Sequence, residues 1–149
     1  MVDRSALGAA GEWFEMDVER GKIREFARAT LSDNPAYLAD ERAISEPTFL
    51  TTMIFWQDES SNPWDTVAMD QERGLHAEQE FTFFGPPPRA GTRLKARSTI
   101  SAIYDKEGRR GGTMTFVEMT TDFHDADGAL VAQSKMTGVE TSRPPDSAP

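Results

Sequence analysis

The sequence of 149 residues contains no cysteine and only two histidines. The absence of cysteine excludes disulfide bonds, thiolate metal ligands and a cysteine nucleophile. No apolar run approaches the ~18 residues that a membrane-spanning helix needs. The N-terminus also lacks the charged and then apolar pattern of a secretion signal. We therefore expect a soluble, cytoplasmic protein without a membrane span.

Basic residues are also few, because 16 lysines and arginines stand against 25 acidic residues, a formal net charge of -9. Such a surface repels a phosphate backbone unless its cations are clustered. The densest cationic cluster, Lys106, Arg109 and Arg110, has acids nearby and is typical of a solvated hairpin tip. We therefore expect no nucleic-acid partner. The spacing of histidine and acidic residues predicts no metal site, and no glycine-rich loop follows a predicted strand.

The length fits one domain, predicted over residues 11–142, with flexible tails at residues 1–10 and 143–149. A short strand is expected at residues 12–16. Apolar residues then recur at three- and four-residue spacings up to Leu31, which predicts a surface helix that Asp17 could cap. Pro35 ends this pattern. Residues 47–56 begin with a proline and are apolar on most sides, which predicts a helix buried in the middle of the molecule.

From residue 75 onward the pattern changes to four strands joined by short turns. They are predicted at residues 75–84, 92–105, 113–125 and 129–140. In the second strand, simple alternation predicts two faces. One face holds Leu94, Ala96, Ser98, Ile100, Ala102 and Tyr104, and the other holds Arg93, Lys95 and Arg97. The expected fold class is α+β, with a curved antiparallel sheet wrapped around the central apolar helix and an open edge that a second subunit covers.

Six segments, in order, resemble the N-terminal half-domain of MaoC-like dehydratases, also called the FAS1-like dehydratase domain. They are VERGKIREFARAT, DNPAY, EPTFLTT, GLHAEQEF, PPRAGTRLKARSTISAIYDKEGRRGGTMTFV and DGALVAQSKMTGVETSRP. The resemblance covers about residues 11–144 and implies a single hot-dog domain. It also implies kinship with (R)-specific enoyl-CoA hydratases and 3-hydroxyacyl-thioester dehydratases. These are lyases of a carbon–oxygen bond that act on acyl-CoA or acyl-carrier-protein thioesters without a cofactor.

The loop of active members reads Asp-x-Asn-Pro-x-His, and its acid and imidazole activate one water molecule. Asn34 and Pro35 fix the register here, so Ser32 stands at the aspartate position and Tyr37 at the histidine position. Neither a serine hydroxyl nor a phenol is a base near neutral pH. Asp33 is a fallback acid, although capping of a turn explains it better. The resemblance therefore implies an accessory subunit whose partner, a second MaoC-like hot-dog chain, carries the catalytic pair.

The same resemblance implies which residues meet the acyl-thioester. Backbone N–H groups at the start of the buried helix are expected to polarise the thioester carbonyl. The candidate binding residues are Asn34, Tyr37, Glu46, Pro47, Thr48, Phe49 and Trp56. A basic edge of Arg89, Arg93, Lys95 and Arg97 could meet the phosphates of CoA or of a phosphopantetheine arm, and a solvated strand face explains it as well.

His76 leaves a second hypothesis open. Residues two and four positions apart on a strand share a face, so His76 with Glu78 or Glu80 could serve a self-sufficient homodimeric hydratase. A histidine bonded within a sheet or an interface is the simpler reading, and His124, beside a turn, is expected to be exposed. Two more alternatives are a module that binds acyl-thioesters without turnover and a thioesterase. The partner is a second hot-dog subunit, in a heterodimer or heterotetramer, or a second copy of this chain.

Overall fold

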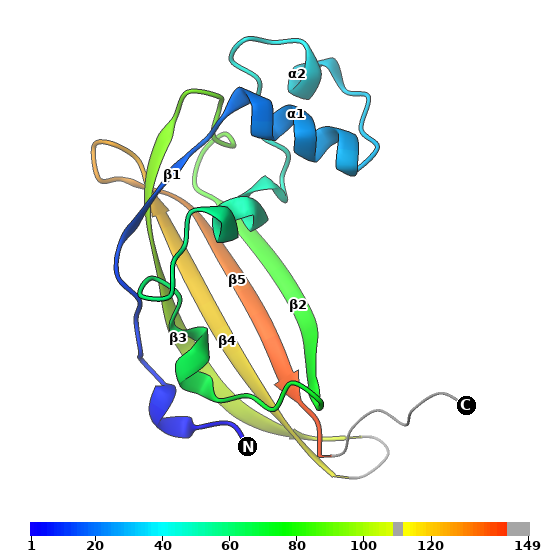
Figure 1. Ribbon diagram of the computed structural model, residues 1–149, viewed down its shortest axis with the longest axis vertical. Coiled ribbons are helices and arrows are strands. Elements are labelled where there is room, and N and C mark those ends of the chain that lie inside the picture. The colour runs from blue at the N-terminus through cyan, green and yellow to red at the C-terminus, as the bar shows by residue number, and fades with distance from the viewer. Residues whose placement is uncertain (109–111, 143–149) are drawn as a thin grey trace.

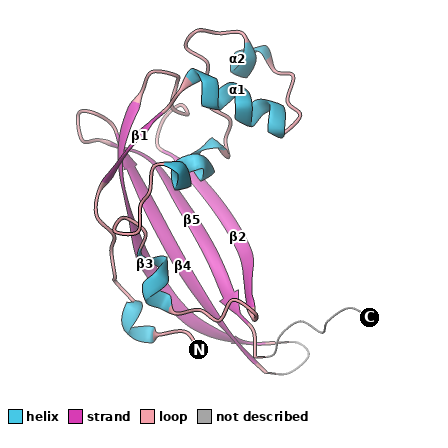
Figure 2. Ribbon diagram, in the orientation of Figure 1, coloured by secondary structure: helices cyan, strands magenta, loops and turns pink. Residues whose placement is uncertain are grey.

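A computed structural model describes residues 1–108 and 112–142. Five antiparallel strands form one elongated sheet in the order β1-β3-β4-β5-β2, and the helical segments lie over one of its faces and at one end (Figures 1 and 2). The strands are β1 (Phe14–Asp17), β2 (Gly74–Phe83), β3 (Arg93–Glu107), β4 (Thr113–His124) and β5 (Leu130–Glu140). The α-helices are α1 (Arg20–Ala29) and α2 (Pro35–Leu38), and the 3-10 helices are η1 (Arg4–Ala6), η2 (Phe49–Phe55) and η3 (Pro63–Val67). The predicted α+β class is confirmed, while Arg109, Arg110 and the predicted tail at 143–149 lie outside the described residues.

The covered side, called the inner face, carries two clusters of buried apolar residues. The first is packed by α1 and η2 and contains Phe14, Met16, Val18, Ile23, Ala43, Phe49, Leu50, Met53, Ala90, Leu94, Ala96, Phe123 and Ala132. The second is packed by η1 and η3 and contains Val2, Ala6, Val67, Ile100, Val117 and Met119. Each large side chain taken out of water contributes about 1.5–3 kcal/mol, so the two clusters hold the helical segments on the sheet.

The first ten residues are packed against the sheet. Val2 and Ala6 are buried in the second cluster, and the Gly8 N–H donates to the Ile100 carbonyl at 2.9 Å. The prediction of a flexible N-terminal tail is therefore wrong for this segment. The small side chains of this segment gave no sign in the sequence that its backbone forms hydrogen bonds with β3.

The first helix begins later than predicted, and Asp17 does not cap it. The N-cap residue is Glu19, whose side chain makes no capping hydrogen bond. Asp17 instead ends β1 and accepts a hydrogen bond from Arg93 Nε at 2.7 Å. The Asp17 carboxylate, predicted as a helix cap, is therefore bound by Arg93 on the neighbouring strand β3.

The predicted buried helix is a short 3-10 segment, η2, with one buried and one exposed side. Phe49 and Leu50 are fully buried, whereas Ile54 and Phe55 are 61% and 67% exposed. The Thr51 and Thr52 hydroxyls donate to the carbonyls three residues earlier, at 2.7 and 2.8 Å. Such side-chain bonds compete with regular α-helical pairing. The prediction of burial on most sides is therefore wrong at the C-terminal end of η2.

Two β-bulges change which side chains share a face. The pairing of β3 with β4 shifts between Ile100 and Ala102, and that of β2 with β5 shifts between His76 and Glu78. One extra residue sends every later side chain to the opposite side of the strand. Ala102 and Tyr104 therefore lie on the outer face, away from the inner-face residues with which alternation grouped them.

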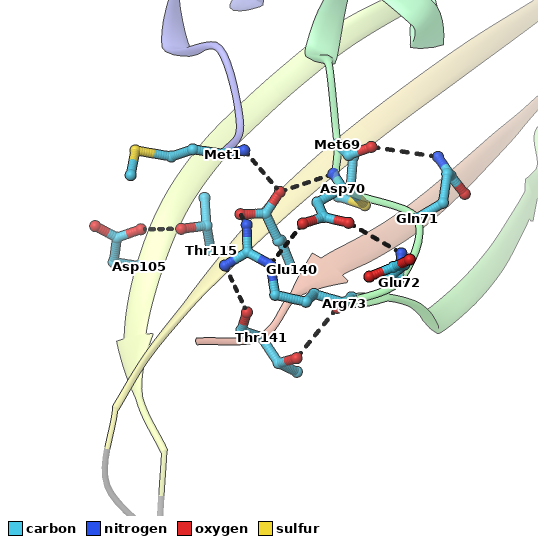
Figure 3. A network of polar contacts seen from close by, with 10 residues as sticks. All are labelled: Met1, Met69, Asp70, Gln71, Glu72, Arg73, Asp105, Thr115, Glu140 and Thr141. Atoms are coloured by element: carbon cyan, nitrogen blue, oxygen red, sulfur yellow. Dashed lines mark hydrogen bonds and ion pairs between the residues drawn. The ribbon is translucent and has the colours of Figure 1, made fainter. Parts of the chain in front are cut away.

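An ion network fixes the end of the sheet where β2 begins (Figure 3). The buried Glu140 carboxylate accepts from the Asp70 N–H at 2.9 Å and from Arg73 Nη2 at 3.0 Å. It also lies 3.5 Å from the Met1 ammonium. The hydrogen bond from Arg73 lowers the pKa of the Asp70 carboxyl. This network ties the segment before β2 to the last strand.

Candidate functional site

The loop of residues 32–37 leaves α1 by a sharp turn and makes several of its hydrogen bonds within itself. Leu31 adopts a left-handed conformation, with φ of 59°. Asn34 Oδ1 then accepts from the Ala36 N–H at 3.0 Å, and Pro35 occupies the first turn of α2. Ser32 Oγ accepts from the Asn34 N–H at 3.4 Å. Asn34 and Ser32 therefore act as local caps in this structure.

The loop lies against the segment that enters η2. The half-buried Tyr37 packs on the first core cluster, in which the Phe26 and Phe49 rings meet edge to face at 5.8 Å. The Ile44 N–H donates to the Ala36 carbonyl at 3.2 Å. The fold therefore brings the 32–37 loop and the start of η2 together, as the predicted site requires, but Phe49 is fully buried and belongs to the core.

Glu46 brings a buried carboxylate to this place. It is 6% exposed, and its two oxygens lie 3.1 and 3.0 Å from Thr30 Oγ1. The neighbouring Ser45 Oγ is buried and has no hydrogen-bond partner among the described residues. The role predicted for Glu46 involved its backbone N–H group alone. The signal for the side chain was an acid directly before a helix-starting proline.

Two backbone donors remain at the start of η2. Pro47 carries no N–H, so the prediction that it donates to a thioester oxygen is wrong. Within residues 1–108 and 112–142, the Glu46 and Thr48 N–H groups donate no hydrogen bond. Trp56, at the end of η2, is half-buried against the first core cluster. These two N–H groups can therefore still bind a carbonyl oxygen.

His76 lies far from the loop and on a different face from Glu78. The bulge places it opposite Gly138 on the inner face, whereas Glu78 lies opposite Thr137 on the outer face. The prediction that His76 shares a face with Glu78 and Glu80 is therefore wrong. From His76 to Phe83, near the loop end of the sheet, the strand runs for about 23 Å at 3.3 Å per residue.

The surroundings of the two histidines differ. His76 lines a cavity of about 200 Å³ together with Trp64, Met69, Gln71, Gly74, Leu75, Met136 and Gly138. Gly138 is needed there because an added Cβ would lie 2.7 Å from the Trp64 ring. His124 is half-buried, not exposed as expected, and meets the Trp13 ring edge to face at 5.5 Å. Neither ring lies at the 32–37 loop.

Three of the four predicted phosphate-binding cations are engaged on the outer face. Arg93 bonds to Asp17, and the Lys95 ammonium and Arg97 guanidinium lie 5.1 and 5.8 Å from the centre of the Trp13 ring. Intramolecular contacts therefore already use these charges.

Arg89 lies apart from those three cations. Its Nη1 donates to the Arg42 carbonyl at 3.0 Å. Both arginines line a cavity of about 260 Å³ beside Pro88 and Asp125. The predicted basic edge is therefore divided between two places, and the Arg89 part borders a cavity.

A second group of ionisable residues gathers on the outer face beside β2. The acidic cluster consists of Glu78, Glu80 and Glu118. Lys135 Nζ pairs with Glu80 at 3.0 Å, and the Tyr104 hydroxyl donates to Glu118 at 3.0 Å. Burial and the hydrogen bond to Glu118 raise the pKa of the Tyr104 phenol, and the hydrogen bond to Glu80 raises that of Lys135. Alternation did not predict this group, because a bulge in β2 precedes Glu78 and a bulge in β3 precedes Tyr104.

Among residues 1–108 and 112–142, no three histidine, aspartate or glutamate side chains form a group suited to a metal ion. None of the helices in this part of the chain is both long and apolar enough to cross a membrane.

Sequence comparison relates the chain to a described domain family. Residues 5–134 match the family described as "FAS1-like, dehydratase domain region". A UPF0336 protein of Streptomyces griseus is 33% identical over 123 residues, which cover 77% of this chain and 78% of that protein. A UPF0336 protein of Thermobifida fusca is 31% identical over 129 residues, or 80% and 84% of the two chains.

Comparison with solved structures supports the fold. A chain of the C-terminally truncated HadBC (3R-hydroxyacyl-ACP dehydratase) complex of Mycobacterium tuberculosis matches with a TM-score of 0.67 at 24% identity, over 90% of this chain and 96% of that one. A chain of the ChsH1-ChsH2 complex of the same organism gives 0.70 at 13% identity, over 95% and 90%. The MaoC-like dehydratase of Rhodospirillum rubrum gives 0.60 at 19% identity, over 94% and 95%. The hot-dog architecture is therefore confirmed.

Proposed function

Because the chain belongs to the FAS1-like dehydratase domain family, we propose that it is the accessory subunit of an enoyl-thioester hydratase or 3-hydroxyacyl-thioester dehydratase. It shapes the acyl pocket while a catalytic hot-dog chain supplies an aspartate and a histidine. The substrate is an acyl-CoA or acyl-carrier-protein thioester, and the reaction needs no cofactor.

The observation that carries this proposal is a loop with the expected shape but with no acid at position 32 and no base at position 37. Asn34 and Pro35 build the turn, but Ser32 bonds within the loop and Tyr37 packs on the core. His76 and His124 both lie in the sheet, away from the loop. Addition of water to an enoyl thioester requires a base for the water and an acid for the carbon, and we expect a second chain to provide this pair.

This chain can still stabilise the charge that develops on the thioester oxygen. The Glu46 and Thr48 N–H groups are unused within the described residues. Preorganised donors of this kind stabilise an enolate-like oxygen more than they stabilise the ground-state carbonyl. Tyr37 and Trp56, both half-buried beside the first cluster, would border the acyl group.

The exposed edge of the sheet supports a two-chain assembly. In the described part of the chain β2 pairs only with β5, so its other edge leaves N–H and C=O groups unpaired. Native proteins usually cover such an edge. Ile54 and Phe55 add exposed apolar area on η2. Two of the structurally similar chains come from complexes of differently named subunits, HadBC and ChsH1-ChsH2.

The test is hydration of a trans-2-enoyl-CoA, followed by the loss of enoyl-thioester absorbance. We expect no turnover by the purified chain and turnover when a catalytic hot-dog chain is added. Turnover by the chain alone that is lost in His76→Ala would contradict the proposal and favour the homodimeric alternative. Binding of acyl-CoA without turnover by the chain or the pair would indicate a binding module, and release of free CoA a thioesterase.

A further inference from the structure

The acidic cluster holds more negative charge than its surroundings neutralise. Glu78, Glu80 and Glu118 lie around Lys135 on the outer face. The hydrogen bond to Glu80 and the charges of all three carboxylates raise the pKa of Lys135. Lys135 pairs with Glu80 at 3.0 Å. Glu78 makes no side-chain hydrogen bond or ion pair within the described residues. Three negative charges against one positive charge leave an excess of two beside the open edge of β2.

A buried hydroxyl in the same place also lacks a partner. Thr137 lies between Glu118 on β4 and Glu78 on β2 in the sheet register, so its side chain is on their face. It is 2% exposed, and its Oγ1 has no hydrogen-bond partner among the described residues. Buried polar groups are rarely left in this state. The site therefore lacks a hydrogen-bond donor as well as positive charge.

A second copy of this chain that pairs through its own β2 offers no lysine or arginine, because β2 contains neither. In an antiparallel pair, directly opposed residues share a face and diagonal neighbours lie within reach of long side chains. If two β2 edges pair about a centre at residue 78, 79 or 80, Glu78 or Glu80 of one copy faces a glutamate of the other directly. Like charges so placed weaken association.

We propose that the acidic cluster receives a lysine or arginine side chain from the edge strand of a different hot-dog chain, and so selects that chain over a second copy. The inference rests on the proposed function, because it specifies the partner of that assembly. The incoming cation would pair with Glu78 and lie next to the Thr137 hydroxyl. An Arg or Lys head group suits the site because it carries only donors and positive charge.

The test uses the full chain and charge-reversed copies of itself. A wild-type chain labelled with a fluorophore at its C-terminus is titrated with unlabelled wild type, Glu78→Lys or Glu59→Lys, and association is followed by fluorescence anisotropy. Glu59 is exposed in the loop before η3 and serves as the matched control. We expect Glu78→Lys to bind the labelled chain about ten-fold or more tighter than wild type does. We expect 0.5 M salt to reduce that gain.

Equal affinity of the labelled chain for wild type, Glu78→Lys and Glu59→Lys would overturn the inference, as would a wild-type homodimer that Glu78→Gln does not strengthen. Circular dichroism of each variant confirms that it is folded. The titration contains no thioester, so its failure leaves the hydration assay untouched. Conversely, turnover by the chain alone would reject the accessory role without changing the measured affinities.

Discussion

The 32–37 loop and the acidic cluster are both polar, but their hydrogen bonds end in different places. In the loop, Ser32 and Asn34 bond to neighbouring backbone N–H groups. In the acidic cluster, Glu78 makes no side-chain hydrogen bond or ion pair within the described chain, and the buried Thr137 hydroxyl has no hydrogen-bond partner there either. The turn of the loop is therefore capped within one chain, whereas the buried hydroxyl of the cluster is left without a bond.

This difference indicates which region a second chain must complete. Hydrogen bonds between neighbouring residues hold the turn of the loop without a ligand. Its resemblance to the loop of active members is therefore evidence for a shared turn more than for a shared reaction. The buried Thr137 hydroxyl has no hydrogen bond within the described chain, which is a cost that a hydrogen-bond partner removes. The family resemblance indicates the loop as the place of the reaction. The unpaired Thr137 hydroxyl and the acidic cluster indicate the edge of β2 as the place where a second chain binds.

The largest expected effect comes from removing the support beneath the loop. Phe49→Ala deletes a fully buried ring, and we expect a loss of about 3–5 kcal/mol in the free energy of unfolding, measured with urea. Amide exchange of the loop should accelerate, while that of β2 should follow only the global loss. Phe55→Ala is the control, because its ring is 67% exposed, and should change stability by less than about 1 kcal/mol. A greater loss for Phe55→Ala than for Phe49→Ala would contradict the assignment of the two faces of η2.

A smaller effect is expected when the loop loses its cap. Asn34→Ala removes the side-chain bond to the Ala36 N–H and should cost about 1 kcal/mol. It should leave the affinities of the edge-strand titration unchanged, because the turn of the loop is capped within the chain. Asn62→Ala is a matched comparison, since Asn62 caps η3 through the Trp64 N–H at 3.1 Å. Unchanged stability and unchanged exchange of the Ala36 amide would show that the cap does not hold the loop.

The smallest expected effect is a pH dependence confined to the cluster. Burial and the hydrogen bond to Glu118 raise the pKa of Tyr104, and below pH ~10 the phenol is neutral in both the folded and unfolded chain. At higher pH the unfolded chain loses this proton first, so the free energy of unfolding falls as pH rises through the folded pKa. The phenolate absorbance lost in Tyr104→Phe should therefore titrate above pH 10. Titration of that component below pH 10 would contradict the contact with Glu118.

Much of the fold could be predicted from local patterns. The turn at Asn34-Pro35, the change from helical to alternating periodicity near residue 75, and the four long strands all appear in the structure within a few residues of their predicted bounds. These features depend on near neighbours, since proline geometry and side-chain alternation act over a few residues. The grouping of the loop with the start of η2 was also predictable, because the family resemblance implied it.

The bulges in β2 and β3 were not predictable from alternation. A bulge inserts one residue that simple alternation does not anticipate, and the two bulges appear only in the pairing of β2 with β5 and of β3 with β4. Tyr104 therefore lies on the outer face and not on the face that alternation predicted. His76 and Glu78 lie on opposite faces of the sheet. The burial of Glu46 was missed for a similar reason, because its partner Thr30 is 16 residues away.

The order of strands and helices, the net negative charge and the absence of an acid and a base at positions 32 and 37 follow from the sequence alone, because each depends on residue identity and short-range spacing. Which carboxylates stand together, and which of them lack a partner, depends on strand register. Register is set by packing across the whole sheet, so the acidic cluster beside β2 exists only once the chain has folded.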